Sequence, residues 1–158
     1  MPKITLRTEI KATKEIVFDL SRSVDFHTLS TAHTNETAIA GKTTGLIGLN
    51  ESVTWRAKHL GIYQNLTSKI TAYDRPNYFV DEMQKGAFKE FRHEHHFETV
   101  KGGTLMTDFF EYTSPFGMVG KIVDRLFLTK YITKLLEKRN DSIKAFAESD
   151  KWKEILHE

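Results

Sequence analysis

The sequence predicts an α+β fold in which a curved antiparallel sheet of six to seven strands wraps around a long C-terminal helix. Two short helices follow the first strand. Segments with alternating apolar and polar residues recur through the middle of the chain, and only a few turn-forming residues separate them. Such short connections join antiparallel neighbours. After the last of these segments the apolar residues follow a helical period to about Ser149.

Length and composition limit the possible functions. A chain of 158 residues fits one domain, 1–158, with a sizeable core. A net charge of +2, spread along the chain, argues against nucleic acid as a partner. The lack of cysteine excludes disulfides and thiolate zinc sites and makes a cytoplasmic location the default expectation. We expect no signal peptide and no stable membrane insertion, and the sequence leaves the oligomeric state open.

The first part of the chain predicts a strand, two helices and a short strand. Ile4–Ile10 alternates as a strand does. Thr13 is a suitable N-cap for a helix formed by the following residues KEIVFDLS. A second helix is predicted at about Val24–Thr31, and Glu36–Ala40 is predicted as a short strand.

Longer strand candidates follow, and turns that contain glycine or the sequence Asp-Arg-Pro-Asn join them. The pattern predicts an antiparallel meander. Its strands are Ser52–Leu60, Tyr63–Tyr73, Tyr78–Lys85, Phe91–Val100 and Thr104–Thr113.

The C-terminal part carries two apolar stripes at helical spacing. They predict either two helical segments or one bent helix, with the change near Phe127–Tyr131. The first stripe is Val119, Ile122, Val123 and Leu126. The second is Leu128, Ile132, Leu135, Leu136, Ile143 and Phe146. The basic run Lys130, Lys134, Lys138 and Arg139 is interpreted as the solvated face of this helix.

The last residues, Lys151–Glu158, predict a short helical tail. Trp152 and Ile155 are its expected anchors.

The segment FRHEHHF (residues 91–97) is the most informative part of the chain. Alternate residues of a strand share a face, so His93 and His95 point to the same side as Phe91 and Phe97. Two imidazoles therefore face a core. A buried polar group without a partner costs about 1–3 kcal/mol, so we expect partners or a cavity on this face.

The same alternation, applied to each strand, gives the inner face of the sheet. On Tyr78–Lys85 it is less decisive, but Phe79 and Met83 outweigh Val80, which turns Asp81 inward. The inner face then combines aromatic residues with two acids and three histidines. Its members are Trp55, His59, Asp81, Met83, His93, His95, Asp108, Phe110 and Tyr112.

Nearly the whole chain resembles a known superfamily. The motifs that carry the resemblance are TWRAKHLG (54–61), LTSKITAYDRP (66–76), YFVDEMQKGAFKEFRHEHHFE (78–98) and TLMTDFFEYTSPFG (104–117). They are similar to those of a bacterial subgroup of the START-like, birch-pollen-allergen-like (SRPBCC) superfamily, which includes polyketide cyclase-like proteins. The resemblance implies a helix-grip fold with a cavity that holds a small hydrophobic or amphipathic ligand, lipid- or polyketide-like. It implies no particular reaction.

The polar inner face allows two non-catalytic interpretations. In the first, Asp–His hydrogen bonds across neighbouring strands satisfy one another and have a structural role. In the second, aromatic contact area and a few polar groups bind a ligand. The candidate ligand-binding residues are Trp55, His59, Met83, Phe110 and Tyr112.

The third interpretation is catalysis of the cyclase or aldolase type. His93 or His95 would act as general base, and Asp108 or Asp81 would orient it. Tyr112 would donate a hydrogen bond to a developing enolate.

The fourth interpretation is a metal site. His93 and His95 lie about 7 Å apart at Cα along one strand face, and His59 or Asp108 would supply a third ligand. The resemblance does not point to a metal, so we expect neither a metal nor a cofactor. Beyond these possibilities, an interaction protein with a vestigial cavity remains a further class.

Overall fold

The computed structural model describes residues 2–114, 117–118, 122 and 127–156. The strands are β1 (Lys3–Ile10), β2 (Thr37–Gly41), β3 (Ser52–His59), β4 (Ile62–Asp74), β5 (Tyr78–Lys85), β6 (Glu90–Val100) and β7 (Gly103–Thr113). The helices are α1 (Lys14–Arg22), α2 (Val24–Ser30), α4 (Thr129–Ala147) and α5 (Trp152–Ile155), with a 3₁₀ turn η1 (Ala32–Thr34) after α2.

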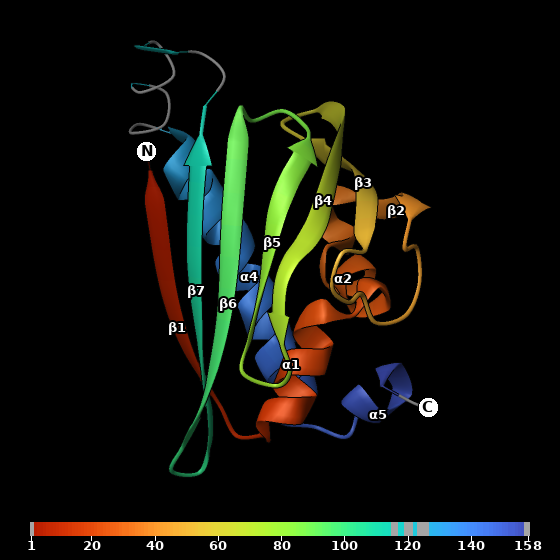
Figure 1. Cartoon of the computed structure of the whole chain (residues 1–158), viewed down its shortest axis with the longest axis vertical. Helices are drawn as coiled ribbons and strands as arrows, with labels where there is room; N and C mark the ends of the chain where they lie inside the picture. The colour runs from red at the N-terminus through yellow and green to blue at the C-terminus, as the bar shows by residue number, and fades with distance from the viewer. Residues whose placement is uncertain (1, 115–116, 119–121, 123–126, 157–158) are drawn as a thin grey trace.

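The strands form one antiparallel seven-stranded sheet in the order β1-β7-β6-β5-β4-β3-β2 (Figure 1). Consecutive strands from β2 to β7 are neighbours, as short connections require. β1 pairs with β7 and completes the opposite edge. The predicted meander is therefore confirmed.

Local sequence signals explain where the early helices begin. The side chain of Thr13 accepts a hydrogen bond from the backbone N–H of Ile16 at the start of α1, as the sequence predicted. Ser23 ends α1 and caps α2 by accepting from the N–H of Phe26. One serine thus serves both helices, and the chain turns sharply between them.

The long helix α4 confirms the second apolar stripe. Ile132, Leu136 and Ile143 are buried along it. The backbone of Phe127 and Leu128 is π-helical directly before α4, within the interval where a change was predicted. The first stripe lies outside the described residues except for Ile122, which is helical and exposed.

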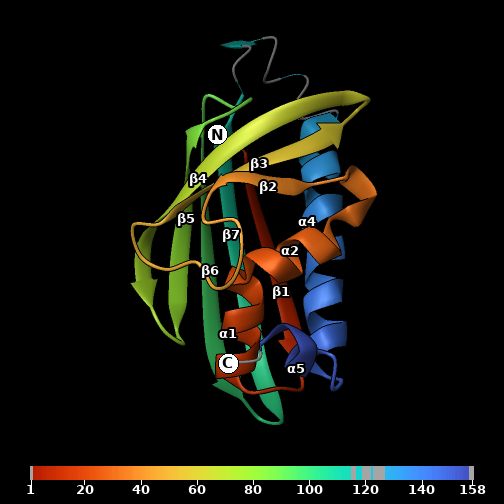
Figure 2. The same cartoon turned by 90° about the vertical axis from the view of Figure 1, so that its right-hand side faces the viewer.

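Helices fill the concave side of the sheet. Figure 2 shows α4 running along the sheet while β2, β3 and one end of β4 curl over toward it. α1 and α2 lie between the sheet and α4 at the end where the chain leaves β1. We call this the closed end. The other end, with the β3–β4 hairpin and the start of α4, is called the wide end.

The buried hydrophobic residues form two clusters. The larger one lies at the closed end and packs α1 and α2 on the sheet, with Phe18 and Phe26 among its fully buried members. The rings of Phe79 and Phe97 meet Phe18 edge-on, with centroids 5.3 and 5.2 Å from that of Phe18. The smaller cluster comprises Ile4, Phe91, Phe110, Tyr112, Ile132 and Leu136.

The Phe18→Ala variant tests the importance of the closed end. Phe18 has no exposed surface, so its removal leaves a cavity, and the free energy of unfolding should fall by about 3–5 kcal/mol. Leu29→Ala is the control, because Leu29 is 51% exposed on α2 and should change stability by no more than about 0.5 kcal/mol. Urea denaturation measures both, and equal losses would contradict the assigned packing.

Candidate functional site

A polar network lies between the sheet and α4. Its sheet members are Asp81 on β5, His93 and His95 on β6, and Asp108 on β7, and the register places Asp81 opposite His93 and His95 opposite Asp108. Asp108 is 0% exposed, and both imidazoles are buried. The predicted inward orientation of these side chains is confirmed. We call this set, with the α4 residues described next, the polar network.

Asp108 is the centre of the polar network. Its Oδ1 accepts a hydrogen bond from His93 Nε2 at 2.8 Å, and its Oδ2 accepts from Asn140 Nδ2 at 2.8 Å. Arg139 and His95 each place a nitrogen 3.4 Å from Oδ1. Burial alone would raise the pKa of Asp108, but hydrogen bonds from the two imidazoles and the charge of Arg139 hold that pKa well below its ordinary value.

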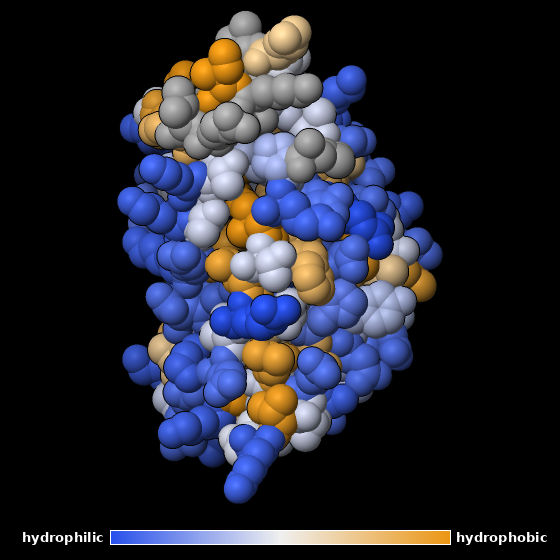
Figure 3. Space-filling model, turned by 90° about the vertical axis from the view of Figure 1, so that its left-hand side faces the viewer, coloured by the Kyte–Doolittle hydropathy of each residue, from blue (hydrophilic) through white to orange (hydrophobic). Residues whose placement is uncertain are grey.

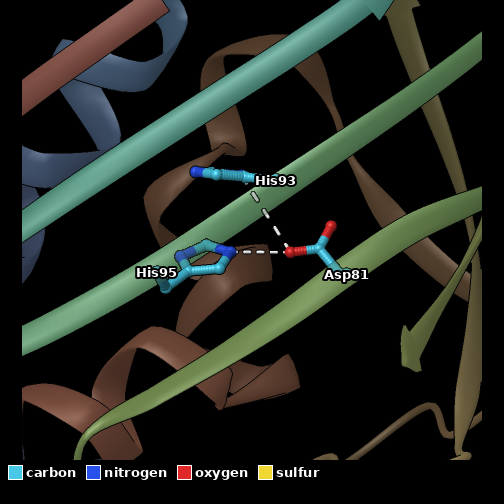
Figure 4. Close-up of side chains that lie close together, drawn as sticks. All are labelled: Asp81, His93 and His95. Atoms are coloured by element: carbon cyan, nitrogen blue, oxygen red, sulfur yellow. Dashed lines mark hydrogen bonds and ion pairs between the residues drawn. The ribbon is translucent and has the colours of Figure 1, made fainter. Parts of the chain in front are cut away.

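Asp81 forms the second carboxylate pair. Its Oδ2 lies 2.6 Å from His95 Nε2 and 4.0 Å from His93 Nδ1 (Figure 4). Burial again acts to raise its pKa, but the hydrogen bond from His95 and the surrounding positive charge leave the pKa below its ordinary value. Both aspartates are therefore carboxylates at neutral pH.

His93 is held as a neutral imidazole. Burial, and secondly the neighbouring His95, lower the pKa of His93, and they outweigh the opposing effect of the two carboxylates. The two imidazole rings have centroids only 3.7 Å apart. Because a carboxylate accepts the hydrogen bond from Nε2, the proton of neutral His93 is on Nε2 and its lone pair is on Nδ1.

Arg139 and Asn140 are site residues that the sequence analysis missed. Arg139 was assigned to the solvated face of α4, which is wrong, because it is only 9% exposed and contacts Asp108. The other three residues of the basic run are exposed as expected. Helical spacing contained the signal, since Arg139 follows Leu136 by three residues and precedes Ile143 by four, on the buried stripe.

The five predicted ligand-binding residues occupy different places on the inner wall. Phe110 packs on Phe91 and beside His93, and Trp55 is buried against the ring of His27 at 4.2 Å. Tyr112 and His59 contact the start of α4, at the wide end. Tyr112 is fully buried, and its hydroxyl hydrogen-bonds Thr129 of α4 at 2.9 Å. His59 is not hydrogen-bonded to the polar network, and its Nδ1 lies 2.9 Å from the hydroxyl of Tyr131. Met83 is partly exposed.

Part of the inner wall is accessible to solvent. The side chain of Asp81 keeps 19% of its accessible surface, although Phe79, which shares its face of the strand, is buried. Met83, Leu66 and His59 are also partly exposed on the inward side. This partly exposed set, which we call the open wall, leads from the polar network toward the wide end.

Two hollows border α4 elsewhere in the described structure. A groove of about 360 Å³ separates α4 from the edge strand β1, and Asn140 contributes to its lining. Figure 3 shows the face on which β1 lies, where hydrophobic residues form a narrow stripe between hydrophilic borders. The second hollow, between α2 and α4, reaches Arg139 but has no room for a water molecule.

Exchanging Arg139 tests whether the polar network holds the structure together. Arg139→Met removes the buried cation beside Asp108, so unfolding should require about 3–5 kcal/mol less free energy. Lys138→Met changes the adjacent exposed residue and should have little effect. Chemical denaturation of the two variants gives the comparison, and an equally stable Arg139→Met protein would refute a stabilising role.

The lowered pKa of His93 predicts acid sensitivity. An unfolded chain has a histidine pKa of about 6.5, so below this pH it binds a proton that folded His93 does not accept, and stability falls with pH. His93→Gln should flatten this decrease between pH 7 and 5 relative to the wild-type protein. His96→Gln, on the outer face of the same strand, should not. Stability that rises toward pH 5 would contradict the assignment.

Among the described helices, none has the length and apolar character needed to cross a membrane.

Several solved structures share the fold at low sequence identity. TTHA0849 from Thermus thermophilus superposes with a TM-score of 0.71 at 16% identity, covering 91% of this chain and 98% of the other. Ginseng major latex-like protein 151 from Panax ginseng gives 0.68 at 19% identity, covering 94% and 98%. CV1439 from Chromobacterium violaceum gives 0.69 at 9% identity, covering 94% and 98%.

No curated protein sequence matches the chain significantly. A family profile, described as polyketide cyclase / dehydrase and lipid transport, matches residues 1–148. The profile match confirms the superfamily expected from the sequence, and the superpositions confirm the helix-grip fold. The chain therefore belongs to the polyketide cyclase / dehydrase and lipid transport family.

Proposed function

We propose that the protein binds a small hydrophobic or amphipathic molecule, lipid- or polyketide-like, against the open wall. The observation that carries this proposal is the exposed surface of inward-facing residues. Asp81, Met83, Leu66 and His59 keep accessible surface on the concave side of the sheet, whereas the closed end is packed by α1 and α2. A ligand there would lie between the sheet and the start of α4.

The chemistry of the open wall suits an amphipathic ligand. Met83 and Leu66 pack against the smaller hydrophobic cluster and offer apolar contact. The Asp81 carboxylate and the His59–Tyr131 pair offer polar groups at two ends of this surface. A few polar groups on an otherwise apolar wall fix the orientation of a ligand whose affinity comes from buried apolar area. The lipid transport named in the family description is consistent with this chemistry.

The catalytic alternative has less support. His93 and His95 are buried, and each already has a carboxylate partner. A general base must reach the proton that it removes, within about 3.2 Å or through one water. Among the members of the polar network, Asp81 has the largest exposed fraction of its side chain. A substrate on the open wall would therefore meet that carboxylate before either imidazole. The hydrogen bond of each imidazole to a carboxylate favours a structural role for these pairs.

Filling the open wall tests the binding proposal. Met83→Trp places a larger side chain in the space that a ligand would occupy, so affinity for a fluorescent fatty-acid analogue should fall by about tenfold or more. Gln84→Trp is the matched control, because the next residue of β5 is exposed on the opposite face.

Fluorescence titration measures the affinities, and native mass spectrometry of the purified protein tests for a ligand carried from the cell. Equal affinity of both variants and the wild-type protein would place the binding surface elsewhere. A wild-type protein that neither carries a ligand nor binds the analogue would refute the proposal.

A further inference from the structure

We propose that Asp81, His93 and His95 form a binding site for a divalent first-row transition-metal ion. Each residue offers one ligand atom, and these atoms all lie within 4.8 Å of one another. Two imidazole nitrogens and a carboxylate oxygen suit such ions, of which zinc and cobalt are convenient probes. This inference goes beyond ligand binding on the open wall and does not depend on it.

The two distances from the Asp81 carboxylate to the imidazole nitrogens bracket those of a metal site, and all three ligand atoms lie within 4.8 Å of one another. Ligand atoms 2.0–2.2 Å from one ion are about 3.0–3.5 Å apart in tetrahedral or octahedral geometry. Asp81 Oδ2 lies 2.6 Å from His95 Nε2 and 4.0 Å from His93 Nδ1, so the required distances fall between these two values (Figure 4). The Asp81 side chain is partly exposed and has no hydrogen bond to α4 among the described residues, so a small rotation of it can bring both distances into range.

His93 gives an independent indication that a cation belongs here. Its Nε2 donates to Asp108, which leaves a lone pair on Nδ1. In the described part of the chain this nitrogen has no hydrogen-bond partner, although the side chain is only 7% exposed. Across 4.0 Å it faces the Asp81 carboxylate, which is another acceptor. Two acceptors that face each other, one buried on His93 and one partly exposed on Asp81, are stabilised by a cation between them.

Asp108 gives the imidazoles the outer support that metal-bound histidines have. Such histidines usually donate their second ring N–H to a carboxylate, which fixes the ring and the tautomer. His93 Nε2 and His95 Nδ1 both approach Asp108 Oδ1, at 2.8 and 3.4 Å. Arg139 and Asn140 hold that carboxylate from α4. The sequence pattern offered Asp108 or His59 as third ligand for a metal that was not expected, whereas the geometry gives that place to Asp81.

The charges of the polar network favour one additional cation. Asp81 and Asp108 supply two acidic groups, and Arg139 is the permanent cation that contacts one of them, Asp108, in the described structure. A metal ion or an additional proton would balance the second acid. The charge of Arg139 weakens metal binding. Asp108 lies between Arg139 and His93, but Arg139 Nη2 lies only 3.4 Å from His95 Nδ1.

Metal titration of untagged, chelator-treated protein distinguishes these two cations. We expect one equivalent of Zn²⁺ or Co²⁺ to bind in calorimetry, a cobalt absorption spectrum with nitrogen and oxygen ligands, and a melting temperature that rises with metal concentration. Asp81→Asn and His93→Gln should each weaken binding by about tenfold or more, and Asp108→Asn by about 10- to 100-fold.

His96→Gln is the matched control. His96 lies on the outer face of the same strand beside Glu94, where an adventitious surface ion would bind. Its exchange should leave the affinity unchanged. The proposal is overturned if the wild-type protein binds neither ion, or if binding survives Asp81→Asn and disappears in His96→Gln.

A second measurement uses the wild-type protein alone, so it tests the site even if the variants do not fold. Paramagnetic Co²⁺ should shift or broaden the ring proton signals of His93 and His95 in the wild-type protein, and should leave those of His96 unaffected. Selective broadening at His96 would likewise refute the assignment.

Discussion

The Asp108 carboxylate is fully buried, and the arrangement of the surrounding elements follows from the need to satisfy it. A buried charge is tolerated only when charges and hydrogen bonds compensate it. Two strands and α4 supply those partners through His93, His95, Arg139 and Asn140. The contact restricts the rotation of α4 about its axis, because both of its polar residues must face the same carboxylate. It also links β6 to β7 through the imidazoles of His93 and His95.

The polar network forms a layer between the two hydrophobic clusters. On β6 the histidines lie between Phe91 of the smaller cluster and Phe97 of the larger one. The same order recurs on β7, where Asp108 lies between Met106 and Phe110, and on α4, where the polar pair lies between members of the two clusters. Along each of β6, β7 and α4, the buried residues therefore change from apolar to polar and back to apolar where the polar network lies. The layer separates the larger hydrophobic cluster of the closed end from the smaller cluster toward the wide end.

The fold could be predicted from the sequence because its signals are local. Alternation and short turns determined the strands to within about two residues. The alternation also turned His93 and Asp108 inward, and for Asp81 the greater apolar weight of Phe79 and Met83 over Val80 decided the face. Arg139 was missed because its neighbour Lys138 suggested a basic face, although its spacing from Leu136 placed it on the buried one. The partner of His59 could not be predicted, since its contact with Tyr131 depends on how far β3 curls over α4.

The position of the polar network between two apolar clusters has a consequence for the range of ligands that the proposed binding surface could accept. Hydrogen bonds have strict geometry, whereas aliphatic and thioether side chains repack with little loss. The hydrogen bonds around Asp108 therefore restrict the polar network more than packing restricts the neighbouring side chains, such as Met83 and Leu66, which can adapt to a ligand on the open wall. The polar network would keep its geometry when a ligand binds, while the side chains of the open wall adjust to the ligand. Selectivity for the polar group of a ligand would then come mainly from the Asp81 carboxylate. Tolerance of ligand size would come from the apolar side chains of the open wall.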